Sequence, residues 1–298
     1  EVLTELLSTQ TSYGLIKSFK GTSDTYMQNQ AVTYDQAAAG IAALAAGRTA
    51  KAVKIFNFFY NQYKGGDPVW NGFVNMYDAI RGIKGNERTI HAGPNLWMGM
   101  FSLHLYMASS GLQATKALTL AKALMKWARG LDHRDGAISM GPVPNNTIFS
   151  TEHNLDYYAF LRGIKPFLSG ADAAQAQTEM DGVSTWLRTR AYDATRGLFK
   201  RGAYENPVVY SMDTSSFALL LGSQVLEDWY IVRSTFVNRS EMAYRVGTRG
   251  FDVASVENAN WVPRSRYVFR EFTLQMALGF LVMADDEHDR GNFTLEKA

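Results

Sequence analysis

The chain of 298 residues is 46% hydrophobic and 19% charged, and its 30 Lys and Arg residues nearly balance 28 Asp and Glu residues, for a net charge of +2. This composition indicates one folded domain over residues 1–298 with a substantial core, and it argues against long disordered segments and a basic surface for nucleic acid. No apolar run approaches the roughly 20 residues that span a bilayer, and the absence of cysteine excludes disulfides and thiolate chemistry.

Helical periodicity dominates the chain, because apolar residues recur three and four positions apart in successive segments. In chain order, the predicted helices cover residues 2–19, 34–47, 49–64, 96–111, 114–130, 154–170, 174–193, 217–222 and 269–285. The longest segment without this periodicity, residues 66–95, is predicted to form a loop or a short hairpin. Strand-like alternation is scarce, so the sequence predicts an all-α fold of about ten helices.

The predicted helices form pairs of unlike members. One member is apolar almost all round, as in residues 34–47 and 96–111, and its partner carries charge on one side, as in residues 49–64 and 114–130. A helix that is apolar all round is buried, whereas an amphipathic helix faces water, so each short turn joins an inner helix to an outer one. Repetition of such hairpins predicts an (α/α) toroid or barrel, with an open superhelix as the alternative.

A compact polar group lies at the start of each predicted inner helix. These groups are Thr33–Gln36, His91–Trp97, Ser150–Asp156, Ser211–Ser216 and Arg270–Gln275. Such residues commonly cap a helix and suit its dipole. Capping needs only one or two of them, however, and the third group adds residues 152–154 and Asp156 to a cap at Ser150 or Thr151. If the inner helices run the same way round a ring, these groups converge in one polar basin suited to a sugar.

Four segments carry a resemblance to a known superfamily: TYDQAAAGIAALAAG, HAGPNLWMGMFSLHLY, STEHNLDYYAFL and YVFREFTLQMALGF. They run from Thr33 to Phe280 in the order of successive inner helices. With them the sequence resembles the six-hairpin glycosidase-like superfamily, whose members are (α/α) toroids found in many bacterial carbohydrate-active enzymes. The resemblance implies a general acid and a general base at the N-terminal ends of inner helices. The matching positions are Asp35, Glu152, Asp156, Asp213 and Glu271.

Two features depart from the pattern of that superfamily. A small residue such as Gly is expected after the glutamate of the last inner helix, and this chain has Phe272 there, which narrows or alters the site. The chain is also short for a full ring. We therefore expect roughly five to six hairpins, in an incomplete or compact six-hairpin ring.

Glycoside hydrolysis requires two carboxyl groups across the scissile bond, about 5 Å apart for retention or about 6.5 to 9.5 Å for inversion. Glu152 is predicted to be the acid and Asp35 or Asp213 the base, with Glu271 as a further candidate. Aromatic faces beside these groups can stack on a sugar ring, and nearby polar groups can bind its hydroxyls. The predicted substrate-binding residues are Tyr34, Trp70, Asn95, Trp97, His153, Asn154, Asp156, Trp261 and Gln275.

The expected ligand is a poly- or oligosaccharide, without a cofactor or a metal ion. The five His residues form no HExxH motif or i, i+4 pair, and the acidic segments DHRDG and DDEHD are interpreted as turns. Because the chain starts at Glu1 without Met, we expect a processed protein, with a periplasmic or extracellular location slightly favoured over the cytoplasm. The sequence does not indicate an oligomeric state.

Two alternatives to hydrolysis stay open. The same basin suits a non-catalytic glycan-binding or scaffold toroid, in which the sugar is held and not cleaved. A polysaccharide lyase is the other alternative, with His153 as proton acceptor beside Tyr157 or Tyr158 and with Arg264, Arg266 and Arg270 to bind an anionic sugar. One fold hosts many chemistries, so the site and not the fold decides among them.

Overall fold

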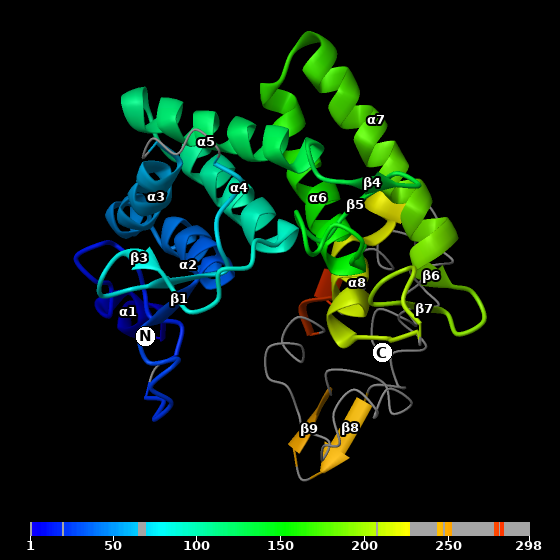
Figure 1. Ribbon diagram of the computed structural model, residues 1–298, viewed down its shortest axis with the longest axis horizontal. Coiled ribbons are helices and arrows are strands. Elements are labelled where there is room, and N and C mark those ends of the chain that lie inside the picture. The colour runs from blue at the N-terminus through cyan, green and yellow to red at the C-terminus, as the bar shows by residue number, and fades with distance from the viewer. Residues whose placement is uncertain are drawn as a thin grey trace. The chain divides into compact units, whose positions relative to one another are not determined.

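The computed structural model describes residues 2–19, 21–64, 70–206, 208–226, 243–246, 248–251, 277–279 and 281–282. Its main helices are α1 (Val2–Ser8), α2 (Thr33–Ala45), α3 (Thr49–Lys64), α4 (Ala92–Met107), α5 (Gly111–Arg129), α6 (Thr151–Ile164), α7 (Gly170–Trp186) and α8 (Met212–Leu226) (Figure 1). A 3₁₀ turn at Lys165–Phe167 follows α6, and a π-helical turn at Leu187–Ala191 follows α7.

The described strands are short and pair as antiparallel neighbours. They are β1 (Gln30–Val32), β2 (Met76–Asp78), β3 (Ile83–Lys84), β4 (His133–Arg134), β5 (Ala137–Ile138), β6 (Tyr192–Asp193), β7 (Leu198–Phe199), β8 (Ala243–Val246) and β9 (Thr248–Phe251). They make one three-stranded sheet, β1-β2-β3, and the pairs β4-β5, β6-β7 and β8-β9. The prediction of an all-α chain with few strands is therefore confirmed for the described residues.

The chain divides into two compact units. The first contains Glu1–His133, Ile138–Thr147 and Phe160–Gln177, and the second contains Arg134–Ala137, Ile148–Ala159 and Thr178–Ala298. The prediction of a single domain over residues 1–298 stays a prediction. Among the described residues, no helix combines the length and apolarity needed to cross a bilayer.

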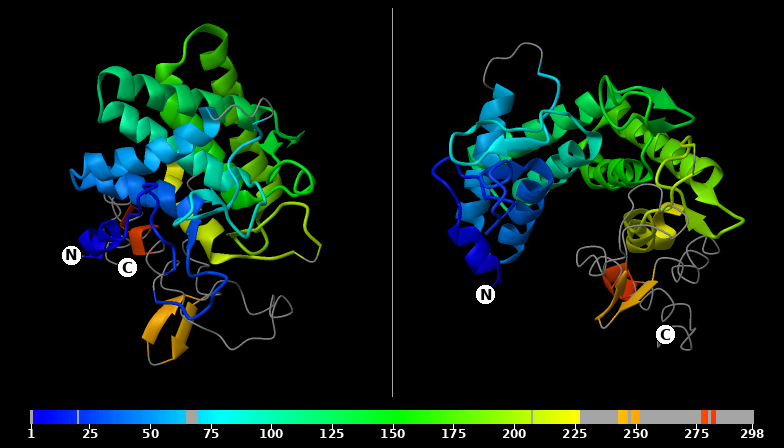
Figure 2. Two further views of the ribbon diagram at one scale, coloured as in Figure 1. Left: turned by 60° about the vertical axis from the view of Figure 1, so that its left-hand side comes forward. Right: turned by 60° about the horizontal axis from the view of Figure 1, so that its bottom comes forward.

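The first unit contains two helical hairpins of the predicted kind. Helix α4 buries most of its length and packs against both α2 and the amphipathic α5, while α2 also contacts the amphipathic α3 (Figure 2). The predicted bounds of α3 match the structure, and α2, α4 and α5 begin within a few residues of their predicted starts. Alternation of buried and amphipathic helices thus identified these hairpins correctly.

Glycines set the close approach of the buried helices. A Cβ at Gly40 of α2 would lie 2.4 Å from the Phe101 ring of α4, and a Cβ at Gly99 of α4 would lie 2.6 Å from the Phe160 ring of α6. Contacts this short do not occur between real atoms, so both rings occupy space that only glycine leaves free.

Two glycine substitutions separate this packing effect from helix propensity. We expect Gly99→Ala to lower the free energy of unfolding by about 1 to 3 kcal/mol, because the methyl group collides with the buried Phe160 ring. Gly163 of α6 is the control, because its added Cβ would meet Leu103 at an ordinary 3.4 Å. Gly163→Ala should leave stability unchanged or raise it by up to about 1 kcal/mol. Urea unfolding of both variants tests this, and equal effects would contradict the packing account.

The predicted helix over residues 2–19 is wrong beyond its first turns, because α1 ends at Ser8. Gly14 has a φ of +88°, and a Cβ there would lie 2.4 Å from the carbonyl oxygen of Lys54. The chain therefore turns at Gly14 in a left-handed conformation, close against α3, and cannot continue as a helix. The apolar spacing that suggested a helix instead buries Leu15 and Ile16.

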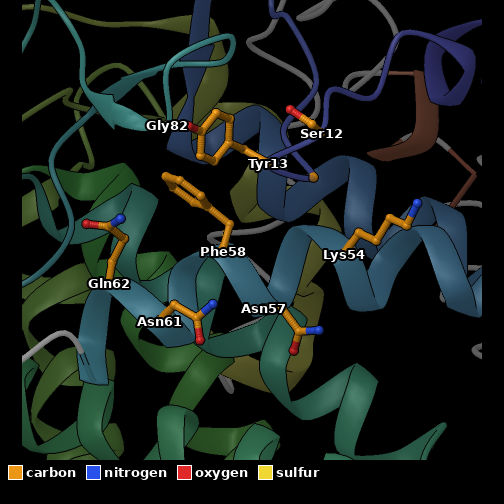
Figure 3. Close-up of a pocket in the computed structure, with 9 residues that line it drawn as sticks. Ser12, Tyr13, Lys54, Asn57, Phe58, Asn61, Gln62 and Gly82 are labelled. Atoms are coloured by element: carbon orange, nitrogen blue, oxygen red, sulfur yellow. The ribbon is translucent and has the colours of Figure 1, made fainter.

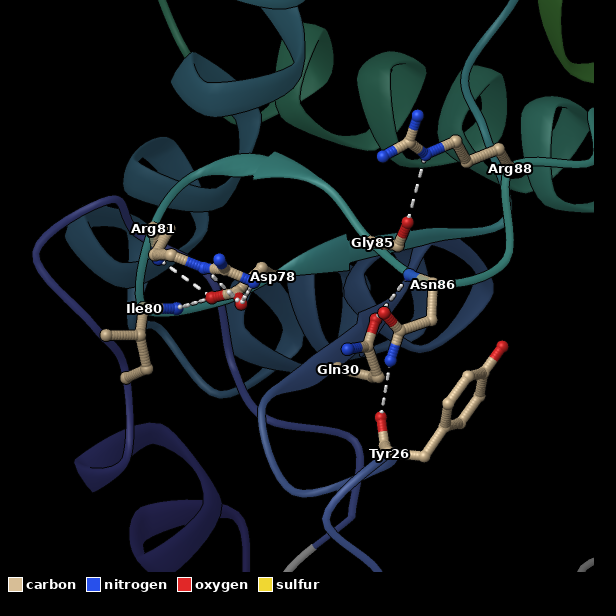
Figure 4. Close-up of polar contacts among 8 residues, drawn as sticks. All are labelled: Tyr26, Gln30, Asp78, Ile80, Arg81, Gly85, Asn86 and Arg88. Carbon is tan, nitrogen blue, oxygen red and sulfur yellow. Dashed lines mark hydrogen bonds and ion pairs between the residues drawn. The ribbon is translucent and has the colours of Figure 1, made fainter.

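The segment between α3 and α4 contains the predicted short hairpin. Strands β2 and β3 pair with Tyr77 opposite Lys84, and β2 also pairs with β1, which the sequence did not reveal. Asp78 closes the turn, since its carboxylate accepts hydrogen bonds from the backbone N–H groups of Ile80 and Arg81 at 2.9 and 2.8 Å (Figure 4). Burial acts to raise the pKa of Asp78, but these bonds and the Arg81 guanidinium outweigh it and lower the pKa.

Candidate functional site

The predicted site residues lie in both compact units. Tyr34, Asp35, Trp70, Asn95 and Trp97 belong to the first unit, and Glu152, His153, Asn154, Asp156 and Asp213 belong to the second. Trp261, Glu271 and Gln275, together with the arginines 264, 266 and 270 of the lyase alternative, lie outside the described residues. The prediction that polar groups mark the starts of buried helices holds at α2, α4, α6 and α8.

The start of α6 is fixed by hydrogen bonds to a segment that lies far along the chain. The Ser150 hydroxyl accepts the N–H of His153 at 3.4 Å, which is the predicted capping bond. The backbone N–H of Thr151 donates to the Arg201 carbonyl oxygen at 2.7 Å, and its hydroxyl donates to the Lys200 carbonyl oxygen at 2.6 Å. These bonds hold the residue that follows, Glu152, in a defined position at the second residue of the helix.

The start of α8 is organised in a similar way. Asp213 is the second residue of this helix, and its carboxylate accepts hydrogen bonds from the Ser211 hydroxyl and from the Thr214 N–H, the latter at 2.7 Å. The Thr214 hydroxyl donates to the Ser211 carbonyl oxygen at 2.8 Å and so fixes the turn that carries Ser211. The Asp213 carboxyl is therefore oriented by two donors of its own helix start.

The structure brings Glu152 and Asp213 together, because the Glu152 and Asp213 side chains are hydrogen-bonded to each other. A carboxylate can only accept a hydrogen bond, so a bond between two carboxyl groups requires that one of them carries a proton. Burial raises the pKa of Asp213, and the bonds from Ser211, Thr214 and Glu152 and the nearby Arg201 charge only partly offset this effect. The contact therefore requires that one proton is held within the pair.

This contact limits how the pair can act on a glycosidic bond. Carboxyl groups in direct hydrogen-bond contact leave no space for the water molecule that an inverting enzyme places between them, about 6.5 to 9.5 Å apart. A retaining enzyme likewise places its two carboxyl groups on opposite sides of the sugar, about 5 Å apart, and not in contact with each other. Glu152 and Asp213 therefore suit a shared proton donor on one side of a bond better than two groups on opposite sides.

The raised pKa of Asp213 predicts a dependence of stability on pH. A carboxyl whose pKa is higher in the folded state favours folding at low pH, and this contribution is lost as the pH rises through the folded-state pKa. Asp213→Asn removes the ionisable group, and its amide oxygen can still accept the Ser211 and Thr214 bonds. We expect this variant to unfold at a higher temperature than the wild type at pH 7, with the difference shrinking toward pH 3.8, the ordinary pKa. An equal difference at both pH values would contradict the burial argument.

The neighbours of Glu152 on α6 are buried. His153, Asn154 and Asp156 are 6%, 0% and 3% exposed, whereas Glu152 is half-buried. Asn154 donates from its side chain to the Ser150 carbonyl oxygen at 2.8 Å, so this amide supports the helix start. Of the polar residues in this motif, Glu152 is the most accessible to a ligand, and sugar binding by the other three stays a prediction.

Asp35 lies at the third residue of α2, in the first unit. Its carboxyl pKa is raised because surrounding protein atoms displace water, and a hydrogen bond from the Ser18 hydroxyl partly offsets this. The same hydroxyl accepts the Val32 N–H at 2.8 Å, so Ser18 is fixed beside the helix start. The predicted role of Asp35 as a base stays a prediction, and Ser18 is a partner that the sequence did not reveal.

Two predicted sugar-binding aromatics meet at the starts of neighbouring helices. The rings of Tyr34 on α2 and Trp97 on α4 have centroids 4.9 Å apart and an interplanar angle of 37°, and both side chains are half-buried. An exposed part of such a pair offers an apolar face to a ring. Trp70 instead packs edge-on against Tyr63 and Phe73 at 5.1 and 5.3 Å, and its role in binding stays a prediction.

Asn95 supports the backbone around the start of α4. Its amide nitrogen donates to the carbonyl oxygens of Phe73 and His91 at 2.9 and 2.8 Å, and its oxygen accepts the Phe73 N–H at 2.7 Å. The side chain is 0% exposed. These bonds give Asn95 a structural role, and its predicted contact with sugar stays a prediction.

The sequence did not single out a polar network at the same helix start. The Asn75 amide bonds both Glu87 Oε1, at 2.7 Å, and His91 Nδ1, at 2.9 Å. If this amide donates to Nδ1, His91 carries its own proton on Nε2. Burial lowers the pKa of His91, and the charge of Glu87 partly offsets that shift. The one sequence signal for this network was that His91 belongs to the polar group His91–Trp97 at the start of the predicted helix.

In the second unit, the sequence also missed Arg201, whose backbone anchors Thr151 and whose charge lies near Asp213. Its guanidinium forms an ion pair with Glu205 at 2.8 Å. No cluster of three or more potential metal-ligating side chains occurs within the ranges that the structure describes. The DHRDG segment forms the β4–β5 turn there, with positive φ at Asp135 and Gly136, in agreement with its interpretation as a turn.

Comparison with protein-family models and with curated protein sequences gives no match to this chain. Solved structures do match it. A glycosidase variant aligns over 98% of this chain and 78% of its own, with a TM-score of 0.67 and 9% identity. A D-mannose isomerase aligns over 99% of this chain and 84% of its own, with a TM-score of 0.66 and 12% identity. A variant of Rex8A from Paenibacillus barcinonensis, complexed with xylose, aligns over 85% and 72%, with a TM-score of 0.60 and 11% identity.

The chain has an (α/α)-toroid fold, like the glycosidase and isomerase structures that it matches. This confirms the predicted fold class. At identities of 9 to 12%, the similarity to these three structures concerns the fold. What this toroid does must therefore be argued from its own side chains, and above all from the contact between Glu152 and Asp213.

Proposed function

We propose that the protein is a carbohydrate-active enzyme that hydrolyses glycosidic bonds in a poly- or oligosaccharide. The observation that carries the proposal is the Glu152–Asp213 pair, which holds a proton at the starts of two buried helices. Two carboxyl groups in contact are unfavourable when both are ionised, because like charges repel, so one of them must stay protonated. General acid catalysis of glycoside cleavage requires a carboxyl group that is protonated at the working pH, and the contact between Glu152 and Asp213 requires such a proton.

The pair acts as the acid in this proposal. The proton leaves the pair for the glycosidic oxygen as the bond to the sugar breaks, and the two carboxyl groups then share two negative charges. Arg201, whose charge lies near Asp213, and the Ser211 and Thr214 donors stabilise that state. Because the pair leaves no room for water, hydrolysis also needs a separate base, and the role of Asp35 as that base stays a prediction.

The proposed substrate is a poly- or oligosaccharide. One structure of similar fold is complexed with xylose, and the half-buried Tyr34 and Trp97 rings supply apolar faces for stacking in this chain. Xylo-, gluco- and manno-oligosaccharides are therefore the first compounds to examine.

The proposal is tested by incubating the purified protein with these oligosaccharides and following the reducing ends that are released. Hydrolysis predicts new reducing ends whose formation stops in Asp213→Asn. A folded wild type that binds an oligosaccharide and never cleaves any of them would refute hydrolysis and support the glycan-binding alternative. A product with a new C=C double bond, detected by its ultraviolet absorbance, would support the lyase alternative instead.

Sugar isomerisation is a second candidate, because a D-mannose isomerase matches this fold as well as the glycosidase variant does. A proton-sharing carboxyl pair can also transfer a proton to and from carbon or oxygen of an open-chain sugar. Incubation with mannose, glucose and xylose in deuterated water distinguishes this reaction. Deuterium at a sugar carbon together with a new monosaccharide would support isomerisation, while hydrolysis leaves carbon-bound hydrogen unchanged.

A further inference from the structure

A polar pocket lies in the first unit, on the outer helix α3 (Figure 3). It has a volume of about 400 Å³ and is lined by α3, by the turn around Gly14 and by Gly82 of the β2–β3 turn. None of its lining residues belongs to the predicted catalytic or substrate-binding set. A volume of this size lies within the range of about 300 to 1,000 Å³ typical of small-molecule sites.

Three carboxamide side chains line this pocket, and their hydrogen-bonding capacity is unused. Asn57, Asn61 and Gln62 follow one another along α3, with Asn57 and Asn61 one helical turn apart (Figure 3). In the part of the chain that the structure describes, none of the three hydrogen-bonds to another protein group. Asn57 and Gln62 are nevertheless half-buried. Each amide offers two donors and an acceptor, which matches hydroxyl groups that both donate and accept.

Aromatic rings complete the pocket. Tyr13 is 49% exposed, and its ring lies against Gly82, where a Cβ would approach it to 2.5 Å. The β2–β3 turn thus holds the ring in place, and its orientation does not have to be fixed when a ligand binds. The Phe58 ring is buried and lies on the same side of α3 as the pocket (Figure 3). A fixed, exposed aromatic face beside amides is a surface on which a sugar ring can stack.

The charge of the lining narrows the ligand class. Among the described lining residues, Lys54 is the one cation and no carboxylate is present. One exposed Lys gives little affinity for a phosphate or a nucleotide, and the amides would leave a lipid chain facing polar groups. We propose that this pocket binds a neutral oligosaccharide, as an accessory site separate from the Glu152–Asp213 pair. The inference rests on the chemistry of the pocket and not on the proposed hydrolysis.

NMR spectroscopy of the side-chain amides tests this proposal at the pocket itself. Xylotetraose, cellotetraose and mannotetraose are titrated separately into the Glu152→Gln variant, which limits cleavage of the probe, and tetragalacturonate serves as an acidic comparison. We expect the Asn57 and Asn61 amide resonances to shift along a saturable curve with at least one neutral probe. The readout is specific to α3, so it does not depend on whether the Glu152–Asp213 pair is catalytic.

Substitutions then establish which groups bind. The double variant Asn57→Ala/Asn61→Ala should weaken binding, followed at the Gln62 amide, by about tenfold or more, because two or more hydrogen bonds are lost. Lys126→Ala, an exposed change on α5 that lines no part of this pocket, should leave the affinity unchanged. The proposal is overturned if no neutral probe shifts the α3 amides, if only tetragalacturonate does, or if the double variant binds as well as the wild type.

Discussion

Replacement of Glu152 by Gln should lower kcat/KM for oligosaccharide hydrolysis by about 10²- to 10⁴-fold, the range that a positioned acid contributes. Gln keeps the size of the side chain, and its amide can donate to the Asp213 carboxylate. It cannot share a proton, however, and its donated bond favours the ionised form of Asp213 over the acid. The acid is therefore lost while the helix start stays intact.

The measurement is kcat/KM on the oligosaccharide that the wild type cleaves best, with the folded state checked by circular dichroism. Asp172→Asn is the matched control, because it also removes one carboxylate, an exposed one that pairs with Arg129. We expect this control to retain wild-type activity. If Glu152→Gln also keeps more than about a tenth of the activity, the acid lies elsewhere in the chain.

Replacement of Asn95 by Ala should lower the free energy of unfolding by about 3 kcal/mol or more, because it leaves buried backbone groups of Phe73 without partners. The side chain spans from α4 to the segment before β2, so its loss also loosens the start of the helix that carries Trp97. Urea unfolding measures the change. Asn61→Ala removes an exposed amide from α3 and should alter stability by less than about 0.5 kcal/mol.

The Asn95 variant also decides between two roles for this residue. A structural role predicts a large loss of stability at an unchanged KM for whatever fraction of the protein is folded. A sugar-binding role, as the sequence suggested, predicts the opposite: a raised KM with little loss of stability. A stability loss below about 1 kcal/mol would contradict the structural role.

The sequence predicted the helices well where apolar and charged positions recur with the helical period. Helix α3 has the predicted bounds because its apolar and charged faces alternate regularly from Thr49 to Lys64. The segment after α1 was mispredicted because apolar spacing does not reveal a left-handed glycine. Gly14 turns the chain through a contact with Lys54, and that contact depends on tertiary structure.

The sequence predicted which carboxyl residues are site candidates, but not which two of them come into contact. The surplus of polar residues after Ser150 indicated that Glu152 does more than cap a helix, whereas Asp213 was singled out by the resemblance to the glycosidase-like superfamily. Which carboxyls meet depends on how the Lys200–Gly202 segment hydrogen-bonds to the start of α6, and no local pattern specifies that register. The sequence alone does not distinguish an Asn95 that binds sugar from one that hydrogen-bonds to the backbone.

The central claim is that Glu152 and Asp213 share one proton. Carbon-13 NMR titration of the two side-chain carboxyl carbons in the free protein tests it most directly. We predict that both resonances respond together in coupled steps, and that the Asp213 carboxyl stays protonated well above its ordinary pKa of 3.8. Two independent titrations, with Asp213 ionising at or below 3.8, would contradict the shared proton and with it the proposed acid.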